Sequence, residues 1–126
     1  MNTDILFFLN DHMDALPLYE HLEARITAQI PDVKIKVSKT QISFSNKHGF
    51  AFVSFLPCRK AKERPNIWMT VSFGLNYRKE SPRIDAASEP YPNRWTHHMM
   101  VGSEEEIDGE LMSWIREAAE FSAGKR

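Results

Sequence analysis

The most continuous apolar run of the chain covers residues 50–56, where hydrophobic side chains fall on both alternating faces of a strand. A strand of this kind must be covered on both sides, which predicts a place in the middle of a β-sheet. Residues 46–49 end in a glycine and are expected to turn this strand back onto residues 41–45 as a hairpin. We therefore expect the fold to be built outward from this hairpin.

Apolar residues spaced four apart predict two helical segments before the hairpin. Thr3 and Asp4 are expected to cap the first, and Pro17 lies in the first turn of the second, where proline is tolerated. Near the other end, Ser103 and the three glutamates after it form a capping-box pattern for a closing helix. The three apolar stripes are Ile5, Leu9 and Met13; Leu18, Leu22, Ile26 and Ile30; and Ile107, Leu111, Trp114, Ile115, Ala118 and Phe121.

Alternation of apolar and polar residues predicts three further strands, over residues 33–37, 67–75 and 94–101. Between the first of these and the hairpin the apolar positions change from odd to even numbers, so a turn or bulge is expected at residues 38–41. Residues 76–93 are rich in turn formers and are expected to be a long loop without regular structure, a kind of connection that is often functional.

Together these elements predict one α+β domain over residues 1–126. Each helix has a single apolar stripe, so the N-terminal helices and the C-terminal helix are expected on one face of an antiparallel meander of about five strands. The other face then presents Trp68, Trp95 or their neighbours to solvent, to a ligand or to a partner.

Length and composition are those of an ordinary globular domain: 126 residues with 42% hydrophobic residues can bury a core. The single cysteine, Cys58, has no partner for an internal disulfide, which is typical of a reducing compartment. The apolar stretch at residues 5–9 is bracketed by polar residues and is too short for a signal sequence or a membrane span. We therefore expect a cytoplasmic protein without a membrane anchor.

Charge is unevenly distributed although the net charge is only −1. Residues 34–64 contain eight basic residues and one acidic residue, whereas residues 1–33 contain one basic and six acidic residues, and residues 103–126 contain three basic and seven acidic residues. This distribution predicts one basic and one acidic surface. The nearly neutral net charge disfavours nucleic acid as the partner, although a local patch keeps that function open.

The strongest candidate for a ligand-binding site is the long connection and the strand after it. Its arginines suit carboxylate or phosphate recognition, and its aromatic residues could stack on a ligand. An equally well supported interpretation is an internal ion-pair network that only holds the loop. The candidate ligand-binding residues are Arg78, Arg83, Tyr91, Arg94 and Trp95.

A second candidate is a basic patch on the predicted loop after the central strand, formed by Arg59, Lys60, Lys62 and Arg64. It is either an anion site or an ordinary solvated loop. Trp68, Tyr77, Tyr91 and Trp95 are candidate stacking residues for a nucleic acid, but aromatic residues at strand spacing more often belong to the core.

Little in the sequence indicates catalysis. The chain lacks a glycine-rich phosphate loop, a His-Glu-x-x-His pattern and a Cys-x-x-Cys pair. His97 and His98 are adjacent on a predicted strand and point to opposite faces, so they are not expected to share a metal ion. Weak candidates for acid–base chemistry are His97 or His98 with Asp85 or Glu89, and Cys58 has no identifiable base. No cofactor or metal is predicted.

Four strings carry a family resemblance: KTQISF at residues 39–44, FAFVSF at 50–55, SPRID at 81–85 and RWTHH at 94–98. In them the chain resembles an uncharacterised family of short bacterial proteins, a domain of unknown function, over nearly its whole length. That resemblance implies no activity. The order of helices and strands is also similar to the frataxin layout and to small YjbR-like proteins proposed to bind DNA, which is a likeness of fold alone.

Three classes of function remain open from the sequence. We prefer a non-catalytic binding or interaction module for an anionic small molecule, nucleic acid or an acidic protein surface. The first alternative is a small hydrolase-like enzyme that uses the histidines and acids named above. The second alternative is a structural subunit that forms a homodimer through the second face of its sheet.

Overall fold

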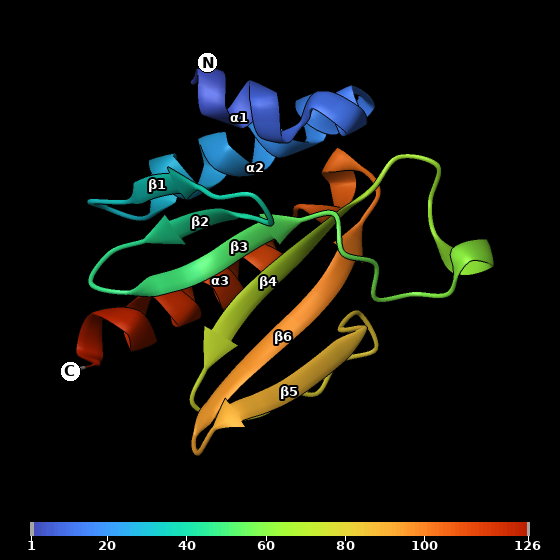
Figure 1. Cartoon of the computed structure of the whole chain (residues 1–126). Helices are drawn as coiled ribbons and strands as arrows, with labels where there is room; N and C mark the ends of the chain where they lie inside the picture. The colour runs from blue at the N-terminus through green and yellow to red at the C-terminus, as the bar shows by residue number, and fades with distance from the viewer. Residues whose placement is uncertain (1, 126) are drawn as a thin grey trace.

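The computed structural model describes residues 2–125 and has the predicted α+β class (Figure 1). Its antiparallel sheet has six strands rather than about five, in the order β1-β2-β3-β4-β6-β5. The strands are β1 (Lys34–Val37), β2 (Ile42–Ser45), β3 (Gly49–Ser54), β4 (Met69–Leu75), β5 (Ala86–Tyr91) and β6 (Arg94–Val101). The α-helices are α1 (Thr3–Phe8), α2 (Leu16–Gln29) and α3 (Gly109–Gly124), and short 3-10 helices occupy Asn10–Ala15, Ala61–Glu63 and Glu104–Glu106.

The predicted hairpin is confirmed as β2 and β3, and β3 lies third in the six-stranded sheet. Its register shifts at the end near the turn, where Phe44 pairs with Ala51 but Ser45 pairs with Gly49. This bulge leaves Phe50 without a partner across β2, and both Phe50 and Ala51 are buried in the core. The turn predicted at residues 38–41 is also confirmed, because it separates β1 from β2.

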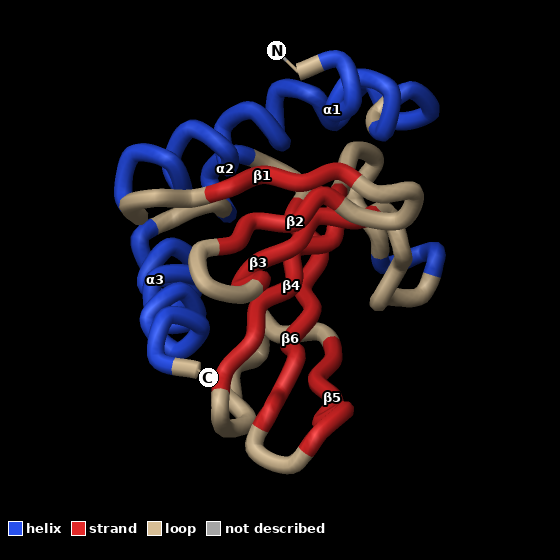
Figure 2. The backbone as a smooth tube through the Cα atoms, turned by 60° about the vertical axis from the view of Figure 1, so that its left-hand side comes forward, coloured by secondary structure: helices blue, strands red, loops and turns tan. Residues whose placement is uncertain are grey.

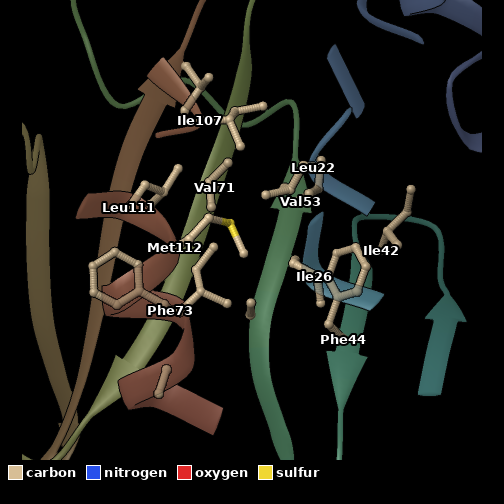
Figure 3. Close-up of a cluster of buried hydrophobic side chains, with 14 of the residues drawn as sticks. Leu22, Ile26, Ile42, Phe44, Val53, Val71, Phe73, Ile107, Leu111 and Met112 are labelled. Carbon is tan, nitrogen blue, oxygen red and sulfur yellow. The ribbon is translucent and has the colours of Figure 1, made fainter. Parts of the chain in front are cut away.

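Helices α2 and α3 cover one face of the sheet, here called the inner face (Figure 2). The inner-face side chains of β2, β3 and β4 meet the apolar stripes of both helices (Figure 3). Helix α1 lies along the β1 edge and adds Ile5 to the same core, as does Leu9, the residue that caps its C-terminus. Side chains that are fully buried at this interface include Ile26, Phe44 and Phe73.

The opposite, outer face of the sheet is mostly small and polar. One row across it runs through Ser43, Phe52, Ser72, His98 and Ala86 on adjacent strands. In the part of the chain that the structure describes, no α-helix packs on this row, and Phe52 is only half-buried although Ser72 next to it is buried. The expectation that the central strand is covered by apolar groups on both sides was therefore wrong for its outer side.

The segment at residues 76–93 is not a loop without regular structure, because its second half forms the edge strand β5. Strand β5 pairs with β6 through a tight turn at Pro92 and Asn93. Asn93 has a φ of 61°, and proline followed by a residue of positive φ suits a type II turn. A hydrogen bond of 3.0 Å from the Asn93 N–H to Glu89 Oε2 holds this turn.

Two helix starts differ from the predicted ones. The cap of α1 is Asn2, which accepts a hydrogen bond from the Asp4 N–H at 2.8 Å, rather than Thr3. The cap of α3 is Asp108, which accepts from the Leu111 N–H at 3.0 Å, rather than Ser103. After Ser103 the chain forms only one 3-10 turn, because the Glu106 carboxylate binds the Gly102 N–H and the backbone leaves the helical region at residue 107.

The connection between β3 and β4 projects beyond the sheet (Figure 1). Its two ends are fixed to the outer face and to the end of β6. The Thr70 hydroxyl donates to the Leu56 carbonyl oxygen at 2.7 Å. Gly102 packs so closely on Pro65 that an added Cβ would lie 2.6 Å from that ring, so a glycine is required there.

Candidate functional site

Arg83 ties the segment before β5 to the start of α3. Its Nη1 donates to both carboxylate oxygens of Asp108, at 3.0 and 3.1 Å, and to Glu110 Oε1 at 2.9 Å. Its Nη2 donates to the Glu106 carbonyl oxygen at 2.8 Å, and its guanidinium lies 5.7 Å from the Trp114 ring centre. Arg83 therefore has the contacts of a structural ion-pair network.

The two cations before Arg83 also have partners within the protein. Arg78 is exposed, lies 3.7 Å from Glu80 and has its guanidinium 5.9 Å from the Trp95 ring centre. Lys79 forms an ion pair of 3.0 Å with Glu117 on α3. Lys79 is thus tied to α3, whereas Arg78 stays exposed beside Trp95.

Arg94, at the start of β6, has a different environment. Its guanidinium lies 5.0 Å from the ring centre of Phe121, and the Lys125 ammonium lies 4.7 Å from the same ring. Within residues 2–125 neither cation forms an ion pair, and the Arg94 guanidinium bonds only to the Asn93 carbonyl oxygen, at 3.3 Å. Burial, and secondly the charge of Arg94, lower the pKa of Lys125.

These two cations lie at an open pocket of 310 Å³ where the β5–β6 turn meets the end of α3. The walls come from β3, β4, β5, β6 and α3, and four of the lining residues are aromatic. We call it the aromatic–cation pocket and define it by Phe52, Tyr91, Arg94, Trp95, Phe121 and Lys125. Of the candidate ligand-binding residues, Tyr91, Arg94 and Trp95 meet here, whereas Arg78 and Arg83 are not among its walls.

His97 is a fully buried part of the inner face. Its Nε2 accepts a hydrogen bond of 2.9 Å from the Lys79 N–H, and its Nδ1 donates to the Phe73 carbonyl oxygen at 3.4 Å. Both ring nitrogens are therefore used, and the imidazole is the neutral tautomer with its proton on Nδ1. Burial lowers the pKa of His97, which agrees with that tautomer.

His98 lies on the outer face, 2.7 Å from the Ser72 hydroxyl through its Nδ1. Burial lowers its pKa as well. The two acids named as catalytic candidates are engaged elsewhere: Asp85 binds the Arg59 guanidinium and the Met100 N–H, and Glu89 binds the turn after β5. Among the described residues, no carboxylate is hydrogen-bonded to either histidine.

The basic patch divides into two structural and two exposed cations. Arg59 forms an ion pair of 2.9 Å with Asp85 and donates to the Met100 carbonyl oxygen at 3.0 Å. The Arg64 side chain donates to the Arg59 carbonyl oxygen at 2.9 Å. Lys60 and Lys62 are exposed on the same connection, so only they face a partner freely.

Cys58 lies beside the same carboxylate, with its sulfur 3.9 Å from Asp85 Oδ2. Burial, and then the negative charge of Asp85, raise the pKa of the Cys58 thiol. A thiol with a raised pKa forms little thiolate at neutral pH, which is the opposite of what a nucleophilic cysteine needs.

Other features of the described residues offer less to an anionic ligand. A larger hollow of 490 Å³ between α1 and β1 is lined by Asp4 and Asp11 as well as Lys39, so it has no single charge. Within residues 2–125 no three histidine, cysteine or carboxylate side chains come together as a metal site. None of the helices described here is long and apolar enough to cross a membrane.

Comparison with known families identifies the chain. The model of the domain of unknown function DUF5655 matches residues 7–122, which is nearly the whole of the 126 residues. The chain belongs to the DUF5655 family. No curated protein and no solved structure matches it. The predicted resemblance to an uncharacterised single-domain family is thereby confirmed. All the defining residues of the aromatic–cation pocket except Lys125 lie within the matched region.

Sequence reasoning missed three members of the aromatic–cation pocket of this DUF5655 domain. Phe121 was assigned to the core stripe of α3, but it is only half-buried and faces Arg94. Lys125 lies four residues after Phe121, so the helical spacing of an aromatic residue and a cation was the available signal. Phe52 was assigned to a covered strand, and only the open outer face makes it a pocket wall.

Proposed function

We propose that this DUF5655 domain is a non-catalytic binding module that holds a small anionic ligand in the aromatic–cation pocket. One observation carries the proposal: Arg94 and Lys125 approach one aromatic ring, at 5.0 and 4.7 Å, beside a pocket whose lining, among residues 2–125, includes no acidic side chain. Two like charges beside one ring repel each other, and an anion bound close to both would reduce that repulsion. The lowered pKa of Lys125 is in line with this unbalanced positive charge.

The shape of the site supports a small ligand over an acidic protein surface. Its 310 Å³ lie at the lower end of the range of about 300–1,000 Å³ that is usual for small-molecule sites. A concave site of this kind, with apolar walls and two polar anchors, receives a small ligand more readily than it meets a flat protein surface.

The hydrolase-like alternative has less support. His97 uses both nitrogens within the core, and Asp85 is held by Arg59 and a backbone N–H. His98 does lie 2.7 Å from the Ser72 hydroxyl, but neither has a carboxylate partner among the described residues. A base that activates a serine is normally oriented by a third group.

The homodimer alternative would use the outer face, whose uncovered row includes Phe52 and His98. That row is mostly small and polar, whereas the core of a stable homodimer interface is strongly apolar. Dimerisation through this face would also cover the aromatic–cation pocket, since Phe52 belongs to both.

The test uses inorganic phosphate and pyrophosphate as probes, with isothermal titration at low salt. Arg94→Gln and Lys125→Gln remove one charge each from the pocket, and Lys62→Gln removes one from the exposed loop as a matched control. A hydrogen bond to a charged group contributes about 1.5–3 kcal/mol, so each pocket variant should weaken binding by about tenfold or more. Lys62→Gln should bind as the wild type does.

Two outcomes contradict the proposal. Equal weakening in all three variants would mean that only overall charge matters. No heat of binding and no thermal stabilisation with either probe would remove the anion site altogether. Analytical ultracentrifugation of the unliganded protein tests the homodimer alternative. A concentration-dependent dimer that is abolished by Phe52→Asp would favour the structural-subunit hypothesis.

A further inference from the structure

Gly74 stands out because it interrupts β4, a strand inside the sheet. Glycine weakens a strand interior and often marks a place where another group approaches the backbone closely. Nothing in the fold requires a glycine here: its φ is not positive, and an added Cβ would meet only the Trp95 carbonyl oxygen, at 3.9 Å. The space above Gly74 belongs to the aromatic–cation pocket, which has Gly74 in its lining.

Gly74 therefore gives this pocket a floor of bare backbone. Thr96 on β6 is the direct partner of Gly74 in the ladder and places a hydroxyl beside that floor. Phe52 from β3 and Tyr91 from β5 belong to the walls on the two sides of the floor.

A second glycine sets the position of the Phe52 wall. The Phe52 ring lies back over Gly49, where an added Cβ would be 2.9 Å from the Phe52 Cζ. The ring therefore leans along its own strand towards the pocket. A flat floor with aromatic walls is the environment that planar rings prefer, because aromatic groups stack or meet edge to face.

The charge at the mouth of the pocket indicates which anion accompanies the ring. Arg94 and Lys125 supply two positive charges, and none of the described residues that line the pocket is acidic. A phosphate monoester carries about −1.5 to −2 charges at pH 7, whereas a carboxylate carries one. The phosphate therefore matches both cations, and a carboxylate would leave one unbalanced.

From the floor, the walls and the paired cations, we propose that the ligand is a small phosphate monoester with a planar aromatic ring, the chemistry of a nucleoside monophosphate. The ring lies over Gly74 between Phe52 and Tyr91, and the phosphate lies between Arg94 and Lys125. This inference rests on the proposed anion-binding function and adds the class of ligand. The pocket volume of 310 Å³ favours one nucleotide over a longer strand.

The first experiment compares five probes by titration calorimetry on the wild-type chain: adenosine monophosphate, uridine monophosphate, adenosine, ribose 5-phosphate and inorganic phosphate. We expect at least one monophosphate to bind ten times more tightly than ribose 5-phosphate and adenosine. If phosphate and ribose 5-phosphate bind as tightly as the monophosphates, the ring contributes nothing; this inference is then overturned while the anion site remains. If no probe binds, both proposals fail.

The second experiment adds a side chain at Gly74, the backbone floor of the pocket. Gly74→Val adds a side chain that strands favour and that points into the pocket, so monophosphate affinity should fall at least tenfold while phosphate affinity is unchanged. Gly74→Ala is the smaller variant in case valine disturbs folding, and it should cause a smaller loss in the same direction. Ala86→Val is the matched control, because Ala86 lies on the same face but is not part of the pocket wall.

Full monophosphate affinity in a folded Gly74→Val variant would overturn the placement of the ring. A third experiment asks whether the ligand is a free mononucleotide or the 5′ end of a nucleic acid strand. A 5′-phosphorylated oligonucleotide that binds more tightly than the monophosphate of the same base would overturn the free small molecule as ligand.

Discussion

The backbone N–H of Lys79 donates a hydrogen bond of 2.9 Å to the imidazole of His97, a side chain with no exposed surface. This contact joins the segment after β4 to the middle of β6. It requires an unprotonated Nε2, so the fold depends on a neutral histidine in its core.

The first prediction is therefore a loss of stability at mildly acidic pH. Burial holds the pKa of His97 below its ordinary value of 6.5, so the unfolded chain binds a proton that the folded chain does not. The contribution of neutral His97 to the free energy of unfolding is fully present above about pH 6.5. Below that pH the free energy of unfolding falls by up to about 1.4 kcal/mol per pH unit, until the pKa of His97 in the folded state is reached. Denaturant titrations between pH 7.5 and 5 measure this slope.

The matching variant is His97→Gln, whose amide oxygen can still accept from the Lys79 N–H. It should be less stable at neutral pH but should show a flatter pH profile than the wild type. An equally steep profile in the variant would assign the slope to other groups and contradict the role given to His97.

The second prediction separates the two arginines that the sequence placed in one site. Arg83→Met removes the contacts with Asp108 and Glu110 and should lower the free energy of unfolding by about 1 kcal/mol, as expected for a partly exposed ion pair. Arg94→Met should change stability by less than about 0.5 kcal/mol but should weaken phosphate binding. Thermal melting and calorimetry on the two variants measure both quantities, and an inverted pattern would place the site at Arg83.

The third prediction concerns Asp85 and Glu89, the candidate acids for acid–base chemistry. Asp85→Ala leaves the Met100 N–H and the Arg59 guanidinium without their acceptor, which should lower the free energy of unfolding by about 1–3 kcal/mol. Glu89→Ala removes one exposed hydrogen bond at the β5–β6 turn and should lower it by less than about 1 kcal/mol. Urea titration of both variants decides, and equal losses would show that Asp85 is no more than a surface residue.

The fourth prediction compares two phenylalanines on neighbouring strands and opposite faces. Phe73→Ala empties a fully buried position between His97 and Trp114 and should lower the free energy of unfolding by about 3–5 kcal/mol. Phe52→Ala, on the open outer face, should lower it by about 1–2 kcal/mol. A loss at Phe52 as large as that at Phe73, by denaturant titration, would mean that the outer face is covered in solution.

The sequence by itself determined the elements whose periodicity is local. The apolar spacing of α2 and α3, the alternation of β1, β4 and β6, and the β2–β3 hairpin were all predicted from it, because burial of one face imposes a regular spacing on neighbouring residues. The same periodicities predicted the α+β class. A glycine in a turn and a change of parity between strands were enough to predict the connections around β2.

Only the tertiary structure decided what lies at the far end of the sheet. The β5 segment, Ala-Ala-Ser-Glu-Pro-Tyr, has little strand propensity of its own and becomes a strand by pairing with β6. The packing of α3 against the sheet also brings Phe121 and Lys125 close to Arg94, which lies about 30 residues earlier in the sequence. The same packing places Arg83 in an ion pair with Asp108. Contacts over such separations follow from how the helix and the sheet pack, and no local pattern encodes them. The aromatic–cation pocket is therefore a property of the fold, although each of its residues was visible in the sequence.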